Sequence, residues 1–106
     1  MPASSLTAYR LTPAAQSDLE DIWIYAARQW SVAQADRYTD ILEDTFERLL
    51  FMPEMARARA EVDPPVRIHP SAEHLIIYRV EDDHLAILRG LGAGQDWQAI
   101  LRAVDQ

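Results

Sequence analysis

The clearest pattern of apolar and polar positions lies between His74 and Leu91, where two apolar runs flank the polar residues 81–84. Each run has the length and the aliphatic, β-branched composition of one strand. Asp82-Asp83 suits a two-residue turn, because Asp tolerates left-handed backbone and hydrogen-bonds its own main chain. The pattern therefore predicts a β-hairpin over these residues.

A turn at Asp82-Asp83 fixes the register of this hairpin. The predicted cross-strand pairs, which share a face of the sheet, are Val80 with Leu85, Tyr78 with Ile87, and Ile76 with Arg89. The more apolar face should meet the core, and it carries Ile76, Tyr78, Val80, Leu85, Ile87, Arg89 and Leu91. The opposite face carries Leu75, Ile77, Arg79, Glu81, Ala86, Leu88 and Gly90.

Two amphipathic segments precede the hairpin and are predicted to be helices. The first begins at Thr12 as cap, with Pro13 in the first turn, and runs to about Trp30. Its apolar stripe, spaced by three and four residues, is Ala15, Leu19, Ile22, Trp23, Ala26 and Trp30. The second is capped by Ser31 and covers Val32 to Phe51, with the stripe Ala35, Tyr38, Leu42, Thr45, Phe46 and Leu49. The short break between them indicates an antiparallel helical hairpin.

Weaker signals predict two further strands. Ala8–Leu11 alternates apolar and polar residues, and Val66–His69 is a short run that Pro70 ends. From Pro53 to Pro65 the chain has no periodic apolar face, so we expect an irregular connector there.

The C-terminal stretch predicts a flexible bend at Gly92-Ala93-Gly94 and a short helix over 95–104. Asp96 would cap that helix, and Trp97, Ile100 and Leu101 would form its apolar face. The complete order favours an α+β fold in one domain, 1–106, with the helical hairpin packed on one face of a small antiparallel β-sheet.

The composition narrows the possible functions. The chain has 106 residues, 49% of them hydrophobic, no Cys, and a formal net charge of −7. An acidic protein is a poor binder of phosphate backbone, so direct nucleic-acid binding is not expected. The N-terminal sequence predicts no signal peptide, and no stretch approaches the ~20 apolar residues of a membrane span. We expect a cytoplasmic protein without a membrane partner.

The sequence favours no metal, cofactor or catalytic site. His69, His74 and His84 lack the spacing of a helical metal site, and no Cys assists them. The serines show no nucleophile-elbow string. The expectation is a protein that acts by binding.

Several strings, in their order and spacing, resemble the ParE toxins of the ParE/RelE toxin–antitoxin superfamily over roughly Tyr9 to Leu91. They are Tyr9–Ala15, Asp18-Leu19 and Ile22-Trp23, then Phe46, Leu49, Pro53, Arg57 and Arg59, then Val66-Arg67, His74–Val80 and Ile87–Arg89. The resemblance implies a toxin of a type II toxin–antitoxin system, of the kind that stabilises plasmids or chromosomes. Its partner would be a ParD-like antitoxin whose C-terminal part wraps the toxin. Its target would be DNA gyrase, inhibited by protein contact.

Two alternatives stay open. Relatives in the RelE branch cleave ribosome-bound mRNA, which needs cationic groups and a proton-transferring group. The candidates for that chemistry are Arg67, His69, His74, Tyr78, Arg79 and Arg89. Family members also follow the last strand with an apolar pair, His and Arg, where this chain has Gly90–Asp96 with three Gly. The second alternative is therefore a decayed toxin that retains only antitoxin binding.

The partner-binding residues are predicted to be large aromatics and arginines. Arginines can bond bidentately to the carboxylates of an antitoxin tail that orders on binding, although internal salt bridges are the alternative. The predicted set is Trp30, Tyr38, Arg57, Arg59, Arg67, Arg79, Arg89 and Trp97.

Overall fold

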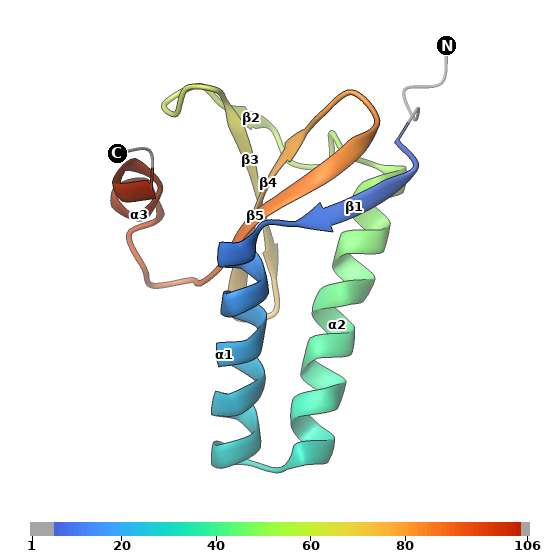
Figure 1. The fold of residues 1–106 in the computed structure, drawn as a ribbon, viewed down its shortest axis with the longest axis vertical. Helices are drawn as coiled ribbons and strands as arrows, with labels where there is room; N and C mark the ends of the chain where they lie inside the picture. The colour runs from blue at the N-terminus through green and yellow to red at the C-terminus, as the bar shows by residue number, and fades with distance from the viewer. Residues whose placement is uncertain (1–5, 105–106) are drawn as a thin grey trace.

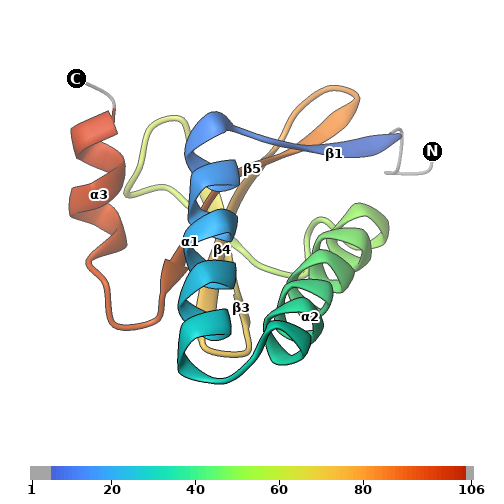
Figure 2. The ribbon, with the colours of Figure 1, turned by 60° about the horizontal axis from the view of Figure 1, so that its bottom comes forward.

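The computed structural model describes residues 6–104 and places two helices against a five-stranded sheet (Figure 1). In chain order the elements are β1 (Ala8–Leu11), α1 (Pro13–Gln29), α2 (Val32–Phe51), β2 (Ala58–Arg59), β3 (Val66–Ser71), β4 (His74–Val80), β5 (His84–Gly92) and α3 (Trp97–Val104). The strand order is β1-β5-β4-β3-β2. The predicted α+β architecture is confirmed. In Figure 2, α3 lies on the far side of α1 from α2.

The two long helices begin where the sequence predicts. Thr12 accepts a hydrogen bond from the Ala15 N–H, and Ser31 accepts one from the Gln34 N–H. Both side chains thereby satisfy amide groups that have no partner within the helix. None of the helices in residues 6–104 is both long and apolar enough to cross a membrane.

The main core lies between the sheet and the α1–α2 hairpin, on what we call the helical face. Its buried members are Ala15, Leu42, Phe46, Leu49, Ala56, Ile76, Tyr78, Leu85 and Ile87. Buried polar groups are paired here: the Tyr78 hydroxyl donates to the Pro53 carbonyl at 2.7 Å, and the Thr45 and Ser71 hydroxyls lie 2.7 Å apart. The α2 stripe is thus confirmed. The placement of Trp30 in the α1 stripe is wrong, because it caps the C-terminus of α1 and is 65% exposed.

The predicted hairpin register holds near the turn and fails beyond it. Val80 pairs with Leu85 and Tyr78 with Ile87 as predicted, but Ile76 pairs with Gly90 rather than Arg89. A β-bulge opposite Ile77 and Tyr78 inserts Leu88 as an extra residue. Because side chains alternate between faces, one extra residue moves everything after it to the opposite face.

The bulge corrects the predicted faces. Arg89 pairs with Ile77, and Leu91 packs in a second buried cluster with Ile77. Both were predicted on the helical face and both belong to the opposite one, which we call the outer face. Val80, also predicted in the core, is 39% exposed.

The outer face has a core of its own beneath α3. Val66, Ile77, Leu91 and Leu101 form it, with the partly buried Val62, Ile68, Leu88, Trp97 and Ile100 packed around them. The predicted apolar face of the C-terminal helix is therefore confirmed, and the Asp96 carboxylate accepts from the Ala99 N–H at 3.2 Å as its cap.

The remaining differences concern the edges of the sheet. β1 pairs with β5 in parallel, so the sheet is not wholly antiparallel. The connector contains a two-residue strand, β2, and β3 continues past Pro70 to Ser71. Proline is tolerated at position 70 because β2 pairs with Val66 and Arg67 and does not extend to Pro70. At Pro70, the edge of β3 that faces away from β4 therefore needs no backbone N–H to bond a neighbouring strand. Likewise, β5 continues to Gly92 rather than ending before the predicted bend.

Candidate partner-binding site

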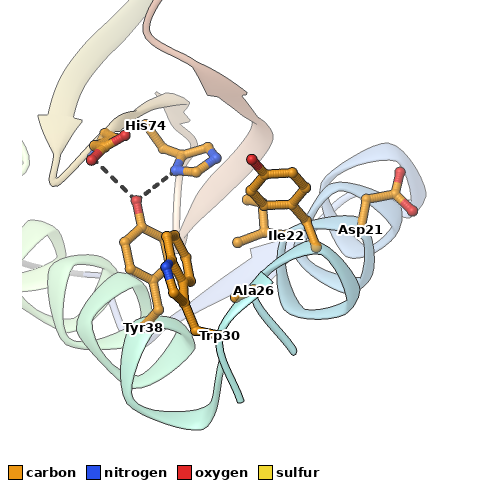
Figure 3. A pocket seen from close by; sticks show the side chains of 8 residues that line it. Asp21, Ile22, Ala26, Trp30, Tyr38 and His74 are labelled. Atoms are coloured by element: carbon orange, nitrogen blue, oxygen red, sulfur yellow. Dashed lines mark hydrogen bonds between the residues drawn. The ribbon is translucent and has the colours of Figure 1, made fainter. Parts of the chain in front are cut away.

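A groove lies where the α1–α2 hairpin meets the β3–β4 turn (Figure 3). It has a volume of about 230 Å³, and we call it the hairpin groove. The residues that line it are Asp21, Ile22, Tyr25, Ala26, Trp30, Tyr38, Glu73 and His74. Three separate stretches of the chain therefore build one concave, mostly apolar surface.

Large aromatic side chains stand open to solvent at this groove. Tyr25 is 61% exposed and Trp30 is 65% exposed, and their rings meet edge to face at 6.3 Å. Val32, in the first turn of α2, is also exposed, at 57%. Clustered exposed apolar groups of this size mark interaction surfaces, and Tyr and Trp are the residue types that contribute most to binding energy.

The polar wall of the hairpin groove joins α2 to the β3–β4 turn. The Tyr38 hydroxyl accepts from the Glu73 N–H at 3.1 Å and lies 2.7 Å from Nδ1 of His74, as the dashed lines in Figure 3 show. Since the backbone amide occupies a lone pair of the phenol, the phenol hydrogen is available to donate to Nδ1. This arrangement requires an unprotonated Nδ1 and leaves the Nε2–H as a donor.

The charge state of His74 agrees with that hydrogen bond. Burial lowers the pKa of His74 below its ordinary 6.5, against an opposing effect of the Glu73 and Asp18 carboxylates. The imidazole is therefore neutral at pH 7. The charged groups that line the groove are Asp21 and Glu73, so its rim is acidic.

The structure brings together only some of the predicted partner-binding residues. Trp30 and Tyr38 line the hairpin groove. Arg59 and Trp97 meet elsewhere, on the outer face, where the guanidinium carbon lies 5.8 Å from the indole centroid. Arg57 is exposed on the connector and does not line the hairpin groove.

The other three predicted arginines have partners within the chain. Arg67 donates to the Ala56 carbonyl on the helical face. Arg89 donates to both oxygens of Asp18, from Nε at 2.7 Å and from Nη2 at 2.9 Å, and the hydrogen bond raises the pKa of Arg89. Arg79 lies 3.8 Å from the exposed Glu81 carboxylate. Their role in partner binding stays a prediction.

Two important residues of the groove, Tyr25 and His74, were not predicted to bind a partner. Tyr25 lies three residues after Ile22, so the helical period already placed it at the margin of the apolar stripe. His74 had no such signal. Its partner Tyr38 is 36 residues away, and only the fold brings the two side chains together.

The groups considered for mRNA cleavage are divided between the two faces of the sheet, although Arg67 pairs directly with Tyr78. The Tyr78 hydroxyl is buried in the main core, while Arg79 and Arg89 lie on the outer face. Arg67 and His69 flank the helical face, paired across from Tyr78 and Ile76. Within residues 6–104, no three His, Asp or Glu side chains are grouped so that they could hold a metal ion.

Known toxins are similar to this chain in sequence. The family described as "ParE toxin of type II toxin-antitoxin system, parDE" matches residues 9–97. Toxin ParE1 of Mycobacterium tuberculosis is 38% identical over 72 residues, which cover 68% of this chain and 74% of the relative. Toxin ParE1 of Caulobacter vibrioides is 36% identical over 72 residues, covering 68% and 75%.

A solved structure has the same fold. It is described as "Chromosomal ParDE TA system from P. aeruginosa" and superposes with a TM-score of 0.72 at 19% identity, covering 85% of this chain and 98% of that chain. Since the match of the family covers most of the sequence and the relatives exceed 30% identity, the chain belongs to the ParE family of toxins in type II toxin–antitoxin systems.

Proposed function

We propose that this toxin acts by binding rather than by catalysis, that DNA gyrase is its target, and that a ParD-like antitoxin neutralises it. The antitoxin occupies the hairpin groove with a segment that carries apolar side chains. A basic residue of that segment meets the acidic rim formed by Asp21 and Glu73.

The observation that carries the antitoxin part of the proposal is the exposure of Tyr25 and Trp30 at the mouth of an apolar groove. Exposed rings of this size leave apolar surface in water, which burial against a partner removes at about 25 cal/mol per Å². The groove wall is already rigid, because Tyr38 bridges the Glu73 amide and His74. A preformed wall reduces the ordering cost of binding.

The division of the possible catalytic groups between two faces, and their internal hydrogen bonds, support action without bond chemistry. Phosphodiester cleavage needs cations and a proton-transferring group within reach of one phosphate. Here Arg89 is neutralised by Asp18, the Tyr78 hydroxyl is buried, and Arg67 is bound to a carbonyl. Membership of the ParE family supports gyrase as the target.

A growth experiment with purified-protein assays tests the proposal. Expression of the toxin alone should arrest growth with a DNA-damage response, and co-expression of its ParD-like antitoxin should restore growth. The purified toxin should inhibit DNA supercoiling by gyrase, and the antitoxin should reverse the inhibition. Codon-phased mRNA cleavage in a translation reaction would instead identify a ribosome-dependent endonuclease.

The glycines at the end of β5 and just after it offer a second test, directed at the decayed-toxin alternative. A side chain at Gly90 or Gly94 would meet nothing within 4 Å, and neither glycine has a positive φ. The fold therefore does not require glycine at these positions. Growth arrest by the natural chain contradicts decay; arrest only after Gly94→Arg supports it and contradicts the intact-toxin proposal.

A further inference from the structure

The outer face of the sheet contains a second cavity, of about 300 Å³, between the start of α1 and α3. Its lining residues are Thr12, Pro13, Ala14, Val62, Val66, Arg79, Leu88, Arg89 and Leu101. We call it the outer cavity. It is separate from the hairpin groove, with which it shares no lining residue.

Arg79, which lines this cavity, has a hydrogen-bond donor without an acceptor. Its Nε is buried and has no hydrogen-bond partner among the described residues. A buried N–H without an acceptor is costly, and such groups are rare in folded proteins. The Nε edge of a guanidinium is also the edge that binds a carboxylate through two parallel hydrogen bonds.

The local charge leaves Arg79 as the poorly neutralised cation of the outer cavity. Arg89, the other cation of the lining, is held by both oxygens of Asp18. Within residues 6–104, the ion-pair partner of Arg79 is Glu81, at 3.8 Å, and the two side chains are 31% and 39% exposed. An ion pair that long and that open to solvent contributes little. Glu81 therefore neutralises Arg79 only weakly, and Arg79 lines the outer cavity.

Two more arginines extend the same surface across the sheet. Arg10 on β1 and Arg79 on β4 both pair with Ala86, from its two sides, and so share the outer face. Arg59 pairs with Val66, which belongs to the outer core. Each of these three arginines has a carboxylate nearby. Even so, all three lie on one face of the sheet in a protein whose net charge is −7.

We propose that the outer cavity is a second docking point for the antitoxin, where an Asp or Glu side chain bonds to Arg79 and a neighbouring apolar side chain enters the cavity. The occupant is an extended acidic segment, because the positive charge of Arg79 and its unpaired Nε–H both favour binding of a carboxylate. The rest of the lining is largely apolar and suits the neighbouring apolar side chain. This inference rests on the proposed function. It assigns opposite charges to the two contacts: a basic, apolar segment in the hairpin groove and an acidic one on the outer face.

The test uses variants of the full-length toxin and measures the dissociation constant of the ParD-like antitoxin. Ala14→Glu places a carboxylate in the outer cavity, and a Glu in the first turn of α1 suits the helix dipole, so the fold should not suffer. Ala14→Gln is the control of equal size without charge. Arg79→Gln removes the cation, and Arg79→Lys keeps the charge but not the bidentate geometry.

We expect Arg79→Gln and Ala14→Glu each to weaken antitoxin binding by about tenfold or more. Arg79→Lys should be intermediate, and Ala14→Gln should bind more tightly than Ala14→Glu by most of that factor. If the antitoxin binds the natural chain and all four variants equally, the outer cavity is not a docking point, whereas the proposed function stands. If it does not bind the natural chain at all, the proposed function itself fails.

Discussion

The two faces of the sheet are filled in different ways. On the helical face, two long helices cover the hairpin, and the buried hydroxyls of Tyr78, Thr45 and Ser71 all have partners. On the outer face, the eight-residue α3 covers one part only. There the buried Nε of Arg79 has no partner among the described residues, and a cavity remains beside it.

This contrast indicates a division of roles. A well-packed and fully hydrogen-bonded core stabilises the fold, because each methylene removed from water contributes about 0.8 kcal/mol. A half-covered face with a weakly paired guanidinium contributes less to stability and keeps binding groups available. The helical face should therefore dominate the free energy of unfolding, while the outer face should dominate the charge dependence of partner binding.

The largest expected effect is on the free energy of unfolding, which compares the two cores directly. Phe46→Ala removes a 1% exposed ring from the helical face and should lower the free energy of unfolding by about 3–5 kcal/mol. Leu101→Ala, at 9% exposure on the outer face, should cost about 2 kcal/mol or less. Urea denaturation at pH 7 measures both. Equal losses would contradict the division of roles.

A smaller effect is expected at the bulge, where α1 is joined to the outer face. The carboxylate of Asp18 accepts from Arg89 through two hydrogen bonds and from the Gly90 N–H at 2.9 Å. Asp18→Asn leaves a partly buried guanidinium without its counter-charge and should cost about 2 kcal/mol of unfolding free energy. The control is Glu81→Gln, which removes the weak partner of Arg79 and should change stability by under about 0.5 kcal/mol.

The smallest effect concerns pH and the polar wall of the hairpin groove. Burial lowers the pKa of His74, and burial together with Arg48 lowers that of His69. Each imidazole protonates more readily in the unfolded chain, so unfolding free energy should fall as pH drops below 6.5 toward the folded-state pKa values. His74→Gln should reduce this slope, measured by thermal unfolding between pH 7.5 and 5. An unchanged slope would mean that the Tyr38–His74 hydrogen bond does not depend on a neutral imidazole.

The two long helices were predictable because each has a local cause. Thr12 and Ser31 cap their helices as expected, and the α2 stripe follows a period that the sequence displays directly. The bulge was not predictable in the same way. No local residue type marks Leu88 as extra, and the shift is held by Asp18, 71 residues from Arg89.

The candidate site was predictable only in part. Trp30 and Tyr38 were found as large aromatics at the helical break and on the α2 stripe, and both line the hairpin groove. The arginines were predicted by residue type. The predicted face was right for Arg79 and wrong for Arg89, and the fold separates Arg67 from both. Arg10 was missed because its place across Ala86 from Arg79 follows from the parallel pairing of β1 with β5.

The most direct test of antitoxin docking at the hairpin groove is the affinity of the ParD-like antitoxin for a groove variant. Tyr25→Ala combined with Trp30→Ala removes both exposed rings and, because neither is in the core, should leave the fold intact. Phe51→Ala is the matched control, since Phe51 is 80% exposed at the other end of α2.

Isothermal titration calorimetry of the three proteins gives the result. We predict that the double variant binds the antitoxin about a hundredfold more weakly than the natural chain, as expected for loss of two aromatic hot spots, while Phe51→Ala binds within about twofold. Unchanged affinity of the double variant, with its fold verified by circular dichroism, would contradict antitoxin binding at the hairpin groove.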